Sequence, residues 1–210
     1  QPEDHEVLVR IAIAGVNPVD WKNIEDPSHS GKQLPFIAGQ DFAGIVEGFG
    51  EGVTRFAIGD RIFGIAREHG SYAEYTCIRD TEAPGPEPLC KIPDDVGDSD
   101  AAAIPTPALT ALASLDWLDV GKDSKLLIIG ASGSVGGFAV QLAKLRGAYV
   151  IGTAHSGSED DVRALGADDV IAYDKSDVTE TVQQKHLGPL DAVLDLANGP
   201  DESKALAPLL

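Results

Sequence analysis

Several components are scarce in this chain of 210 residues, and each scarcity excludes a class of protein. Two cysteines are too few for a disulfide framework. No apolar run approaches the roughly 20 residues that a membrane-spanning helix needs. The first four residues, Gln1 to Asp4, are acidic where a secretory signal would be basic. We therefore expect a cytoplasmic protein with no membrane partner.

Basic side chains are also few, because 16 Lys and Arg residues stand against 34 Asp and Glu residues, for a net charge of −18. Such a surface repels the phosphates of nucleic acids and of anionic membranes, so we expect no nucleic-acid partner. Two origins of the acidity stay open, ordinary solubility and adaptation to salt or cold. A bound cofactor phosphate remains compatible with it, because local amides and a few cations make that kind of site.

The first half of the chain has the pattern of short strands joined by glycine turns. Residues 7–13 are β-branched and mostly apolar, and residues 41–46 and 71–78 are two further strand candidates. No helix of ordinary length is predicted before Asp98. We expect a β-rich domain, built as a small barrel, over residues 1–107. The turn glycines are Gly48, Gly50, Gly52, Gly59 and Gly64.

The second half alternates strands and helices. A proline-rich loop at residues 82–88 and a helical segment at residues 99–118, interrupted at Pro105 and Pro107, lead into it. Strands alternating with helices form a parallel sheet covered on both faces, so residues 108–210 are expected to form a Rossmann-type, doubly wound α/β domain. That fold usually has six strands, and the four predicted here leave its C-terminal strands missing. The expected strands are residues 125–129, 148–153, 169–172 and 190–194, and the helices are residues 134–146, 159–165 and 178–185.

The segment LLIIGASGSVGG, at residues 126–137, ends a strand and opens a helix. Its glycines match the second and third glycines of a G-x-G-x-x-G dinucleotide-binding loop, with an alanine in the first position. The second glycine admits the pyrophosphate, the third allows close packing of helix on strand, and free N–H groups at the helix start attract the phosphates. The alternative is a tight turn without a ligand. The expected cofactor contacts are Ala131, Ser132, Gly133, Val135 and Gly136.

The end of the second strand of this domain distinguishes NADPH from NADH. An NAD site places Asp or Glu there to accept from the ribose 2′-OH, whereas this strand ends in Thr153, Ala154, His155 and Ser156. Without a carboxylate a 2′-phosphate is permitted, and the hydroxyls of Thr153 and Ser156 can donate to it. Against this, no Lys or Arg is adjacent, and acids follow at residues 159–161; we interpret them as the first turn of a helix capped by Ser158. We predict NADPH.

A series of short motifs carries a resemblance that covers about residues 7–196. They are AGVNPVDWK (14–22), GQDFAGIV (39–46), VTRFAIGDRI (53–62), GSYAEY (70–75), PTPALTA (105–111), GASGSVG (130–136) and LGADDVI (165–171). In this order they resemble the zinc-free quinone oxidoreductases, of zeta-crystallin type, within the medium-chain dehydrogenase/reductase superfamily. The resemblance implies a GroES-like catalytic domain followed by the Rossmann domain. It also implies that the chain is incomplete at both ends, without the N-terminal hairpin.

Zinc-dependent members of that superfamily have a Cys where this chain has Asn17, and Gly-His-Glu where it has Gly39, Gln40 and Asp41. Asn17 removes a thiolate ligand and Gln40 removes an imidazole ligand, so we expect no metal at a catalytic site. A structural zinc lobe would need four cysteines. Without a Lewis acid, alcohol oxidation is hard to support, whereas hydride addition to a quinone or activated enone needs only hydrogen bonds.

By resemblance, Asn17 and Asp20 line the substrate side, Thr110 lies by the nicotinamide ribose, and Tyr173 lies at the adenosine end of the cofactor. Tyr72 is a candidate wall or hydrogen-bond donor of the substrate pocket. Asn17 with the following proline has a simpler interpretation as a turn, and Tyr72 has one as a barrel core residue. We identify no general acid, so water is the expected proton source.

The predicted function is therefore transfer of hydride from NADPH to a small-molecule quinone or enone, with the full-length protein a homodimer by resemblance. Two alternatives stay open. One is an enoyl-thioester reductase of the same superfamily, with the same hydride chemistry and a longer acyl pocket. The other is a nucleotide-binding relative without catalysis. The truncated chain is expected to lack parts of the nicotinamide site, and with them activity.

Overall fold

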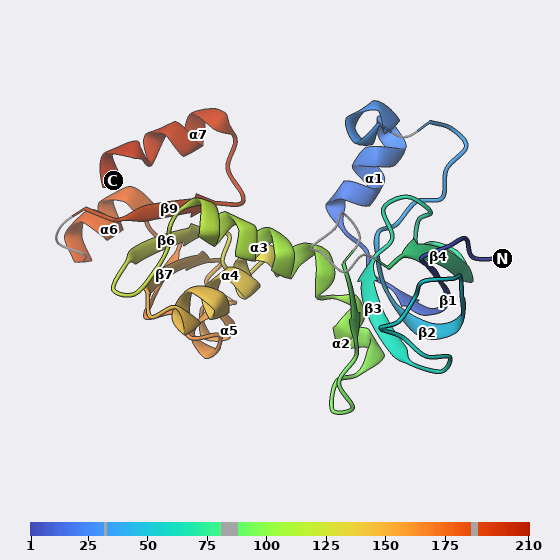
Figure 1. Cartoon of the computed structure of the whole chain (residues 1–210). Helices are drawn as coiled ribbons and strands as arrows, with labels where there is room; N and C mark the ends of the chain where they lie inside the picture. The colour runs from blue at the N-terminus through green and yellow to red at the C-terminus, as the bar shows by residue number, and fades with distance from the viewer. Residues whose placement is uncertain (32, 81–87, 186–188) are drawn as a thin grey trace. The chain divides into compact units, whose positions relative to one another are not determined.

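The computed structural model describes residues 1–31, 33–80, 88–185 and 189–210. The chain divides into two compact units, Gln1–Thr106 and Pro107–Leu210, and each is described here by itself (Figure 1). Within the described ranges, no helix combines the length and the hydropathy that a membrane span requires.

The first unit is built on an antiparallel sheet of five strands in the order β4-β1-β2-β3-β5 (Figure 1). Alternate residues of the long strands point inward, and the buried side chains include Val7, Val9, Phe42 and Val46. The β-rich first half is therefore confirmed. The strands are β1 (Glu6–Ala14), β2 (Asp41–Phe49), β3 (Arg61–Ile65), β4 (Tyr75–Arg79) and β5 (Leu89–Lys91).

Three local expectations for this unit need correction. Strands β3 and β5 were not among the predicted strands, and β4 begins at Tyr75, so Tyr72 lies in the turn before it. A helix precedes Asp98 after all, namely α1 (Pro18–Glu25), followed by a short 3-10 helix, η1 (Pro27–Ser30). The start of α1 has a recognisable sequence signal, with Asn17 at the N-cap position and proline at the first helical position.

The segment predicted as an interrupted helix forms two helices. They are α2 (Asp98–Ala102) and α3 (Pro105–Trp117), and the break falls directly before Pro105. A proline at the first position of a helix lacks only an N–H group that would have had no partner within the helix. The expected interruption is therefore confirmed, and its cause is a new helix start. Residues 82–87 of the predicted proline-rich loop lie outside the described residues.

The second unit contains a parallel sheet of four strands in the order β8-β7-β6-β9 (Figure 1). Numbered along this unit, the order is 3-2-1-4, as in the first part of the Rossmann sheet. The α/β prediction for this half is thus confirmed. The elements are β6 (Lys125–Ile129), α4 (Ser134–Leu145), β7 (Tyr149–Ala154), α5 (Glu159–Ala164), β8 (Asp169–Ala172), α6 (Val178–Lys185), β9 (Ala192–Asp195), α7 (Pro200–Ala205) and η2 (Ala207–Leu209).

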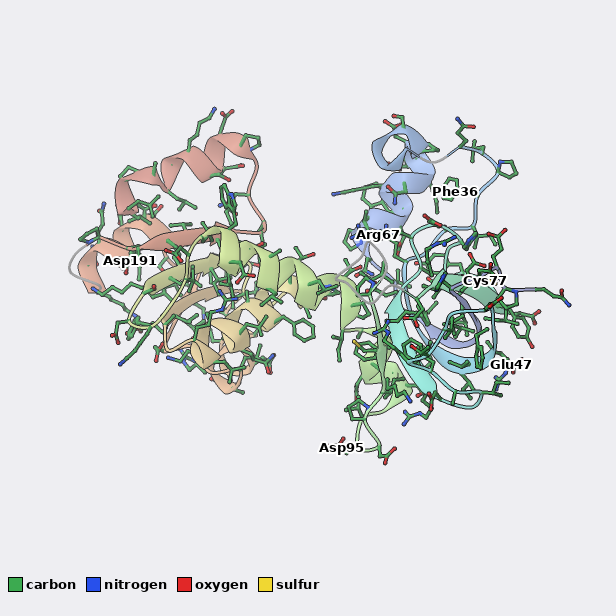
Figure 2. All side chains as sticks on the ribbon, viewed as in Figure 1. Phe36, Glu47, Arg67, Cys77, Asp95 and Asp191 are labelled. Carbon is green, nitrogen blue, oxygen red and sulfur yellow. The ribbon has the colours of Figure 1, made fainter. Side chains whose placement is uncertain are left out.

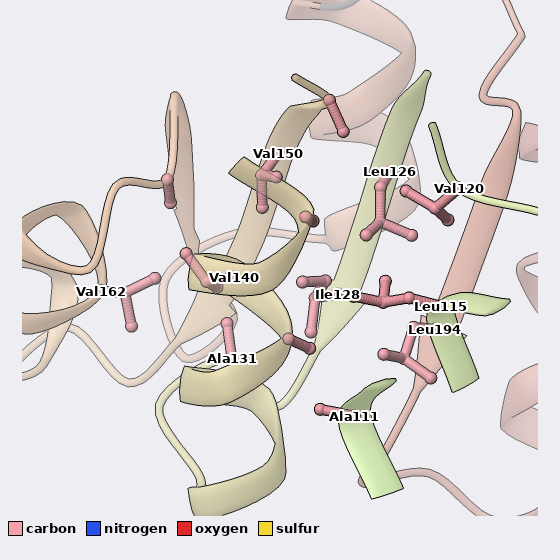
Figure 3. Close-up of a cluster of buried hydrophobic side chains, with 14 of the residues drawn as sticks. Ala111, Leu115, Val120, Leu126, Ile128, Ala131, Val140, Val150, Val162 and Leu194 are labelled. Carbon is pink, nitrogen blue, oxygen red and sulfur yellow. The ribbon is translucent and has the colours of Figure 1, made fainter. Parts of the chain in front are cut away.

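Helices cover both faces of this sheet, which explains the continuous apolar run in β6. Leu126 and Ile128 point to one face, where they pack in a cluster with residues of α3, α4 and α5 (Figure 3). Leu127 and Ile129 point to the opposite face, where they cluster with residues of α6 and η2 and with Leu206, which follows α7. In a strand that is buried on both faces, side chains on either face are apolar, so apolar and polar residues do not alternate.

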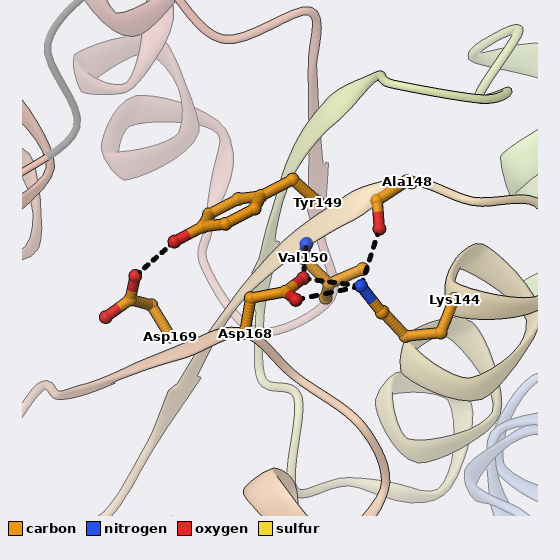
Figure 4. Close-up of polar contacts among 6 residues, drawn as sticks. All are labelled: Lys144, Ala148, Tyr149, Val150, Asp168 and Asp169. Atoms are coloured by element: carbon orange, nitrogen blue, oxygen red, sulfur yellow. Dashed lines mark hydrogen bonds and ion pairs between the residues drawn. The ribbon is translucent and has the colours of Figure 1, made fainter.

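The amino ends of β7 and β8 are held by polar contacts within the protein (Figure 4). Lys144 donates from Nζ to both carboxylate oxygens of Asp168, at 2.9 and 2.7 Å, and to the carbonyl of Ala148 at 2.9 Å. Asp168 also accepts from the Val150 N–H at 2.7 Å. Beside it, the hydroxyl of Tyr149 donates to Asp169 at 2.6 Å. We call this end of the sheet the amino edge.

Candidate functional site

The loop between β6 and α4 lies at the opposite end of the sheet, which we call the carboxyl edge. Gly130 has a φ of 81°, a conformation that L side chains rarely adopt. A Cβ atom on Gly136 would lie 2.2 Å from the Gly130 carbonyl oxygen and 2.7 Å from Cα of Ala131. Gly136 therefore allows α4 to pack directly on the loop, which is the role expected of the third glycine.

Gly133 has a different environment. It is exposed, its φ of −77° suits any residue, and a Cβ there would meet only the Gly130 carbonyl oxygen, at 3.3 Å, among the described atoms within 4 Å. The outer side of the loop is thus open. It faces the start of α4, whose first N–H groups have no partner within the helix and mark the positive end of its dipole. Loop and helix start together fit a pyrophosphate group.

The remaining loop residues divide by exposure. Ser132 is exposed, and Val135 packs at the margin of the hydrophobic core. Ala131 is fully buried and its side chain belongs to the core cluster (Figure 3), so only its backbone is available to a cofactor.

Thr153, which was predicted to contact the cofactor, is buried and bonded to the glycine loop. It is 1% exposed, its Oγ1 accepts from the Gly130 N–H at 3.0 Å, and its carbonyl accepts from the Ala131 N–H at 3.0 Å. The second strand thus holds the glycine loop from behind.

Ser156 follows β7 and donates two hydrogen bonds to the carboxylate of Asp174, a contact that the sequence pattern did not predict. Its N–H donates to Oδ1 of Asp174 and its hydroxyl donates to Oδ2, both at 2.8 Å. His155 lies 3.7 Å from the same carboxylate, and its ring meets that of Tyr173 edge-on at 6.2 Å between centroids. Burial pushes the pKa of Asp174 upward, but the Ser156 hydrogen bonds and His155 outweigh it and leave the pKa below its ordinary value. An anionic side chain therefore occupies this corner.

The first unit holds a buried polar cluster around Asp41, which is 0% exposed. Asp41 Oδ2 accepts from Nδ2 of Asn17 at 2.9 Å and from the Thr106 N–H at 3.0 Å, and Oδ1 accepts from the Thr106 hydroxyl at 2.6 Å. Burial raises the pKa of Asp41, while the bonds from Thr106 and Asn17 oppose the rise. The cluster fixes the orientation of the Asn17 carboxamide. Sequence analysis assigned no role to Asp41 or Thr106.

Asp20 connects Asn17 with Tyr72. Its Oδ2 accepts from the Asn17 N–H at 2.8 Å and from the Tyr72 hydroxyl at 2.9 Å, while its buried Oδ1 has no hydrogen-bond partner among the described residues. Burial, together with the bond to Asp20, raises the pKa of Tyr72 to about 12. The Tyr72 side chain is 40% exposed, so its placement as a barrel core residue is wrong. The structure brings Asn17, Asp20 and Tyr72 together.

Thr110, the remaining predicted catalytic residue, belongs to α3 in the second unit. It is exposed, and its carbonyl accepts from the Ser114 hydroxyl at 2.8 Å.

Comparison with known proteins identifies the family. Residues 3–91 match the alcohol dehydrogenase GroES-like domain, and residues 134–208 match the zinc-binding dehydrogenase family. The chain is 35% identical, over 208 residues, to a chloroplast envelope quinone oxidoreductase homolog of Arabidopsis thaliana; the alignment covers 94% of this chain and 61% of that protein. It is also 33% identical to the trans-enoyl reductase himH of Aspergillus japonicus, over 93% of this chain and 60% of that protein.

Among solved structures, the quinone oxidoreductase of Escherichia coli complexed with NADPH superposes with a TM-score of 0.85 at 27% identity, over 100% of this chain and 63% of that one. The chain belongs to the medium-chain dehydrogenase/reductase superfamily, in its quinone oxidoreductase type. The first unit contains its GroES-like domain and the second its Rossmann-type sheet. The chain spans about three fifths of the length of these relatives.

The positions that hold the zinc ligands in zinc-dependent members of the superfamily have other side chains in this chain. The Asn17 carboxamide is bonded to Asp41, and Gln40, beside it, is half-buried. The described residues contain no group of three or more His, Cys, Asp or Glu side chains that could hold a metal ion. Cys77, on β4 (Figure 2), and Cys90, on β5, are both free thiols.

Proposed function

We propose that the whole protein transfers hydride from a reduced nicotinamide dinucleotide to a quinone or an activated enone without zinc. The observation that carries this proposal is the loop at the carboxyl edge. Gly136 leaves no room for a side chain where α4 meets the loop, while the outer side of Gly133 is open beside the start of the helix. The quinone and enoyl reductases among the relatives support the reaction class.

The bound dinucleotide would supply the hydride, and this chain's residues would bind and orient the reactants. The loop and the first turn of α4 would hold the pyrophosphate through N–H groups. In the first unit, Asp41 orients the Asn17 carboxamide, and Asp20 orients the Tyr72 hydroxyl. Because charge developing on a reduced quinone or enone is spread over a conjugated system, few hydrogen bonds are needed to stabilise it. The second N–H of the Asn17 carboxamide could donate one, whereas the single Tyr72 hydroxyl proton is donated to Asp20. Protons are expected from water.

NADPH was predicted because no acid ends the second strand of the α/β unit. That preference stays a prediction. Its premise is weakened by Asp174, because its carboxylate accepts the Ser156 hydroxyl that was expected to donate to a 2′-phosphate, and the Ser156 N–H as well.

Kinetic assays test the reaction. The full-length protein would be supplied with NADH or NADPH and with a quinone, a simple enone or a short enoyl-thioester. We expect turnover of the quinone or the enone. Preference for the thioester would favour the enoyl-thioester reductase suggested by the Aspergillus relative. Dinucleotide binding without any turnover would indicate a non-catalytic nucleotide-binding relative. Native mass measurement would separately test the predicted homodimer.

Independence from zinc is a separate prediction. Asn17 and Gln40 stand where a zinc site needs Cys and His, so the full-length protein should keep its reductase activity in a strong chelator. Elemental analysis should find well under one zinc per chain. A zinc-dependent alcohol dehydrogenase treated in parallel serves as the control, because chelation must inactivate it. Stoichiometric zinc whose removal abolishes activity would contradict the prediction.

A further inference from the structure

Ser156 and Asp174 join the ends of two neighbouring strands. Ser156 follows β7 and Asp174 follows β8, so both stand at the carboxyl edge. The contact has two points, from the Ser156 N–H and hydroxyl to the two oxygens of one carboxylate, each at 2.8 Å. Two parallel bonds fix the plane of the carboxylate as well as its distance.

β7 is the second strand of this sheet, and in a Rossmann sheet the end of the second strand contacts the adenosine ribose of the cofactor. In dinucleotide-binding sites of this kind, a carboxylate at the end of the second strand accepts from the ribose 2′-OH. This chain has no acid at residues 153–156, but Asp174 reaches the same place from the third strand. A carboxylate that accepts two hydrogen bonds still has lone pairs for a ribose hydroxyl.

A 2′-phosphate would meet a less favourable environment. The Ser156 donors already serve Asp174, and the carboxylate repels a phosphate at short range. Further acids begin α5 at Glu159 and Asp160, and Arg163, the cation of that helix, is bonded to both. Lys175, exposed and next to Asp174 in the chain, is the cation that would oppose this repulsion.

Building on the proposed function, we propose that Asp174 is the specificity-determining residue of the cofactor site, and that it selects the dinucleotide without a 2′-phosphate. Asp174 accepts from the ribose 2′-OH of NADH and excludes the phosphate of NADPH. Ser156 is the positioning residue that holds the carboxylate. This preference is opposite to the one predicted from the second strand alone, because the acid is supplied by the neighbouring strand.

Binding titrations of NADH and NADPH test the proposal without any turnover. The wild-type protein should bind NADH at least about tenfold more tightly than NADPH, which is ~1.4 kcal/mol. Asp174→Asn keeps the size of the side chain and an oxygen that can accept from the Ser156 N–H, but it removes the negative charge. In this variant NADPH should bind more tightly than in the wild type, and the ratio of the two dissociation constants should fall to about threefold or less.

Asp160→Asn is the matched control. It removes the same charge from the same edge of the sheet, but its side chain is fully exposed and bonded to Arg163. Its effect on the ratio should stay below about threefold and vanish at high salt, because exposed charges are screened. Thermal unfolding of each variant verifies folding.

The outcomes separate the two proposals. If both dinucleotides bind but the wild type prefers NADPH, or if Asp174→Asn leaves the ratio unchanged, Asp174 does not select the cofactor, and the proposed reductase function stands. If neither dinucleotide binds the folded wild type, cofactor binding fails, and the selectivity proposal fails with it.

Discussion

The two edges of the parallel sheet use polar groups in opposite ways. At the amino edge, Lys144 and Asp168 bond each other and two backbone groups, and Tyr149 bonds Asp169 (Figure 4). At the carboxyl edge, the first N–H groups of α4 have no partner within the helix, and the loop before them is open on its outer side. The amino edge is therefore closed by its own side chains, whereas the carboxyl edge is open at the glycine loop and is bridged by Ser156 and Asp174 further along.

The largest expected effect is a loss of cofactor affinity caused by a substitution at the carboxyl edge. Gly133→Val places a side chain where a pyrophosphate would lie, while the backbone conformation at Gly133 suits any residue. The affinity for NADH and NADPH should fall at least about a hundredfold, ~2.7 kcal/mol, as measured by titration.

Gly121→Val is the control for that substitution. Gly121 precedes β6 at the amino edge, and a Cβ there would have no described atom within 4 Å. Its cofactor affinity should stay near the wild-type value. Equal losses in both variants would show that the two edges do not differ in the way described.

The next effect concerns stability and belongs to the amino edge. Asp168→Ala removes the bonds from Lys144 and from the Val150 N–H. Hydrogen bonds to charged groups contribute about 1.5–3 kcal/mol, and partial exposure of this pair reduces that value. The free energy of unfolding should fall by about 1–2 kcal/mol in denaturant titrations, with little change in cofactor affinity. Asp201→Ala, which removes a largely exposed acid paired with Lys204, should change it by less than about 0.5 kcal/mol.

The smallest expected effect is a pH dependence of the stability, due to the ionisation of Tyr149 at the same edge. The hydrogen bond to Asp169, together with burial, raises the pKa of Tyr149 from its ordinary value of 10.0 to about 12. A raised tyrosine pKa stabilises the folded state at pH values below the unfolded pKa, and this contribution is lost as pH rises through the folded pKa.

Asp169→Asn should therefore lower the pKa of Tyr149 and bring tyrosinate absorbance to lower pH. Tyr149→Phe combined with Asp169→Asn serves as the control, because it lacks the titrating group and should show no such shift. An unchanged titration curve in Asp169→Asn would mean that the carboxylate does not hold the phenol.

Local patterns predicted the second unit well. The strand and helix alternation and the glycine spacing depend on residues close in sequence, so β8 was placed correctly and the close packing at Gly136 could be anticipated. The contact of Asp174 with Ser156 was not predicted, because the dinucleotide-binding pattern concerns the end of the second strand and not the end of the third. Neighbouring parallel strands end at the same edge, so an acid after the next strand was a usable signal.

The polar cluster of the first unit could not be predicted in the same way. Asp41 and Thr106 are 65 positions apart, and their contact depends on how β2 and the start of α3 are placed. The hydrophobic periodicity of either segment therefore could not predict that contact. The pairing of Asn17 with Asp20 was accessible in principle, because N-cap and third-position residues of a helix commonly contact each other.

The support that Thr153 gives to the glycine loop has a consequence for folding order. Thr153 holds Gly130 from 23 positions further along the chain, through its hydroxyl, and holds Ala131 through its carbonyl. The final shape of the loop therefore includes two hydrogen bonds that only β7, paired beside β6, can supply. A nascent chain that ended before β7 would contain every glycine of the motif and still lack the site. The glycine loop therefore depends on the assembled sheet for its conformation.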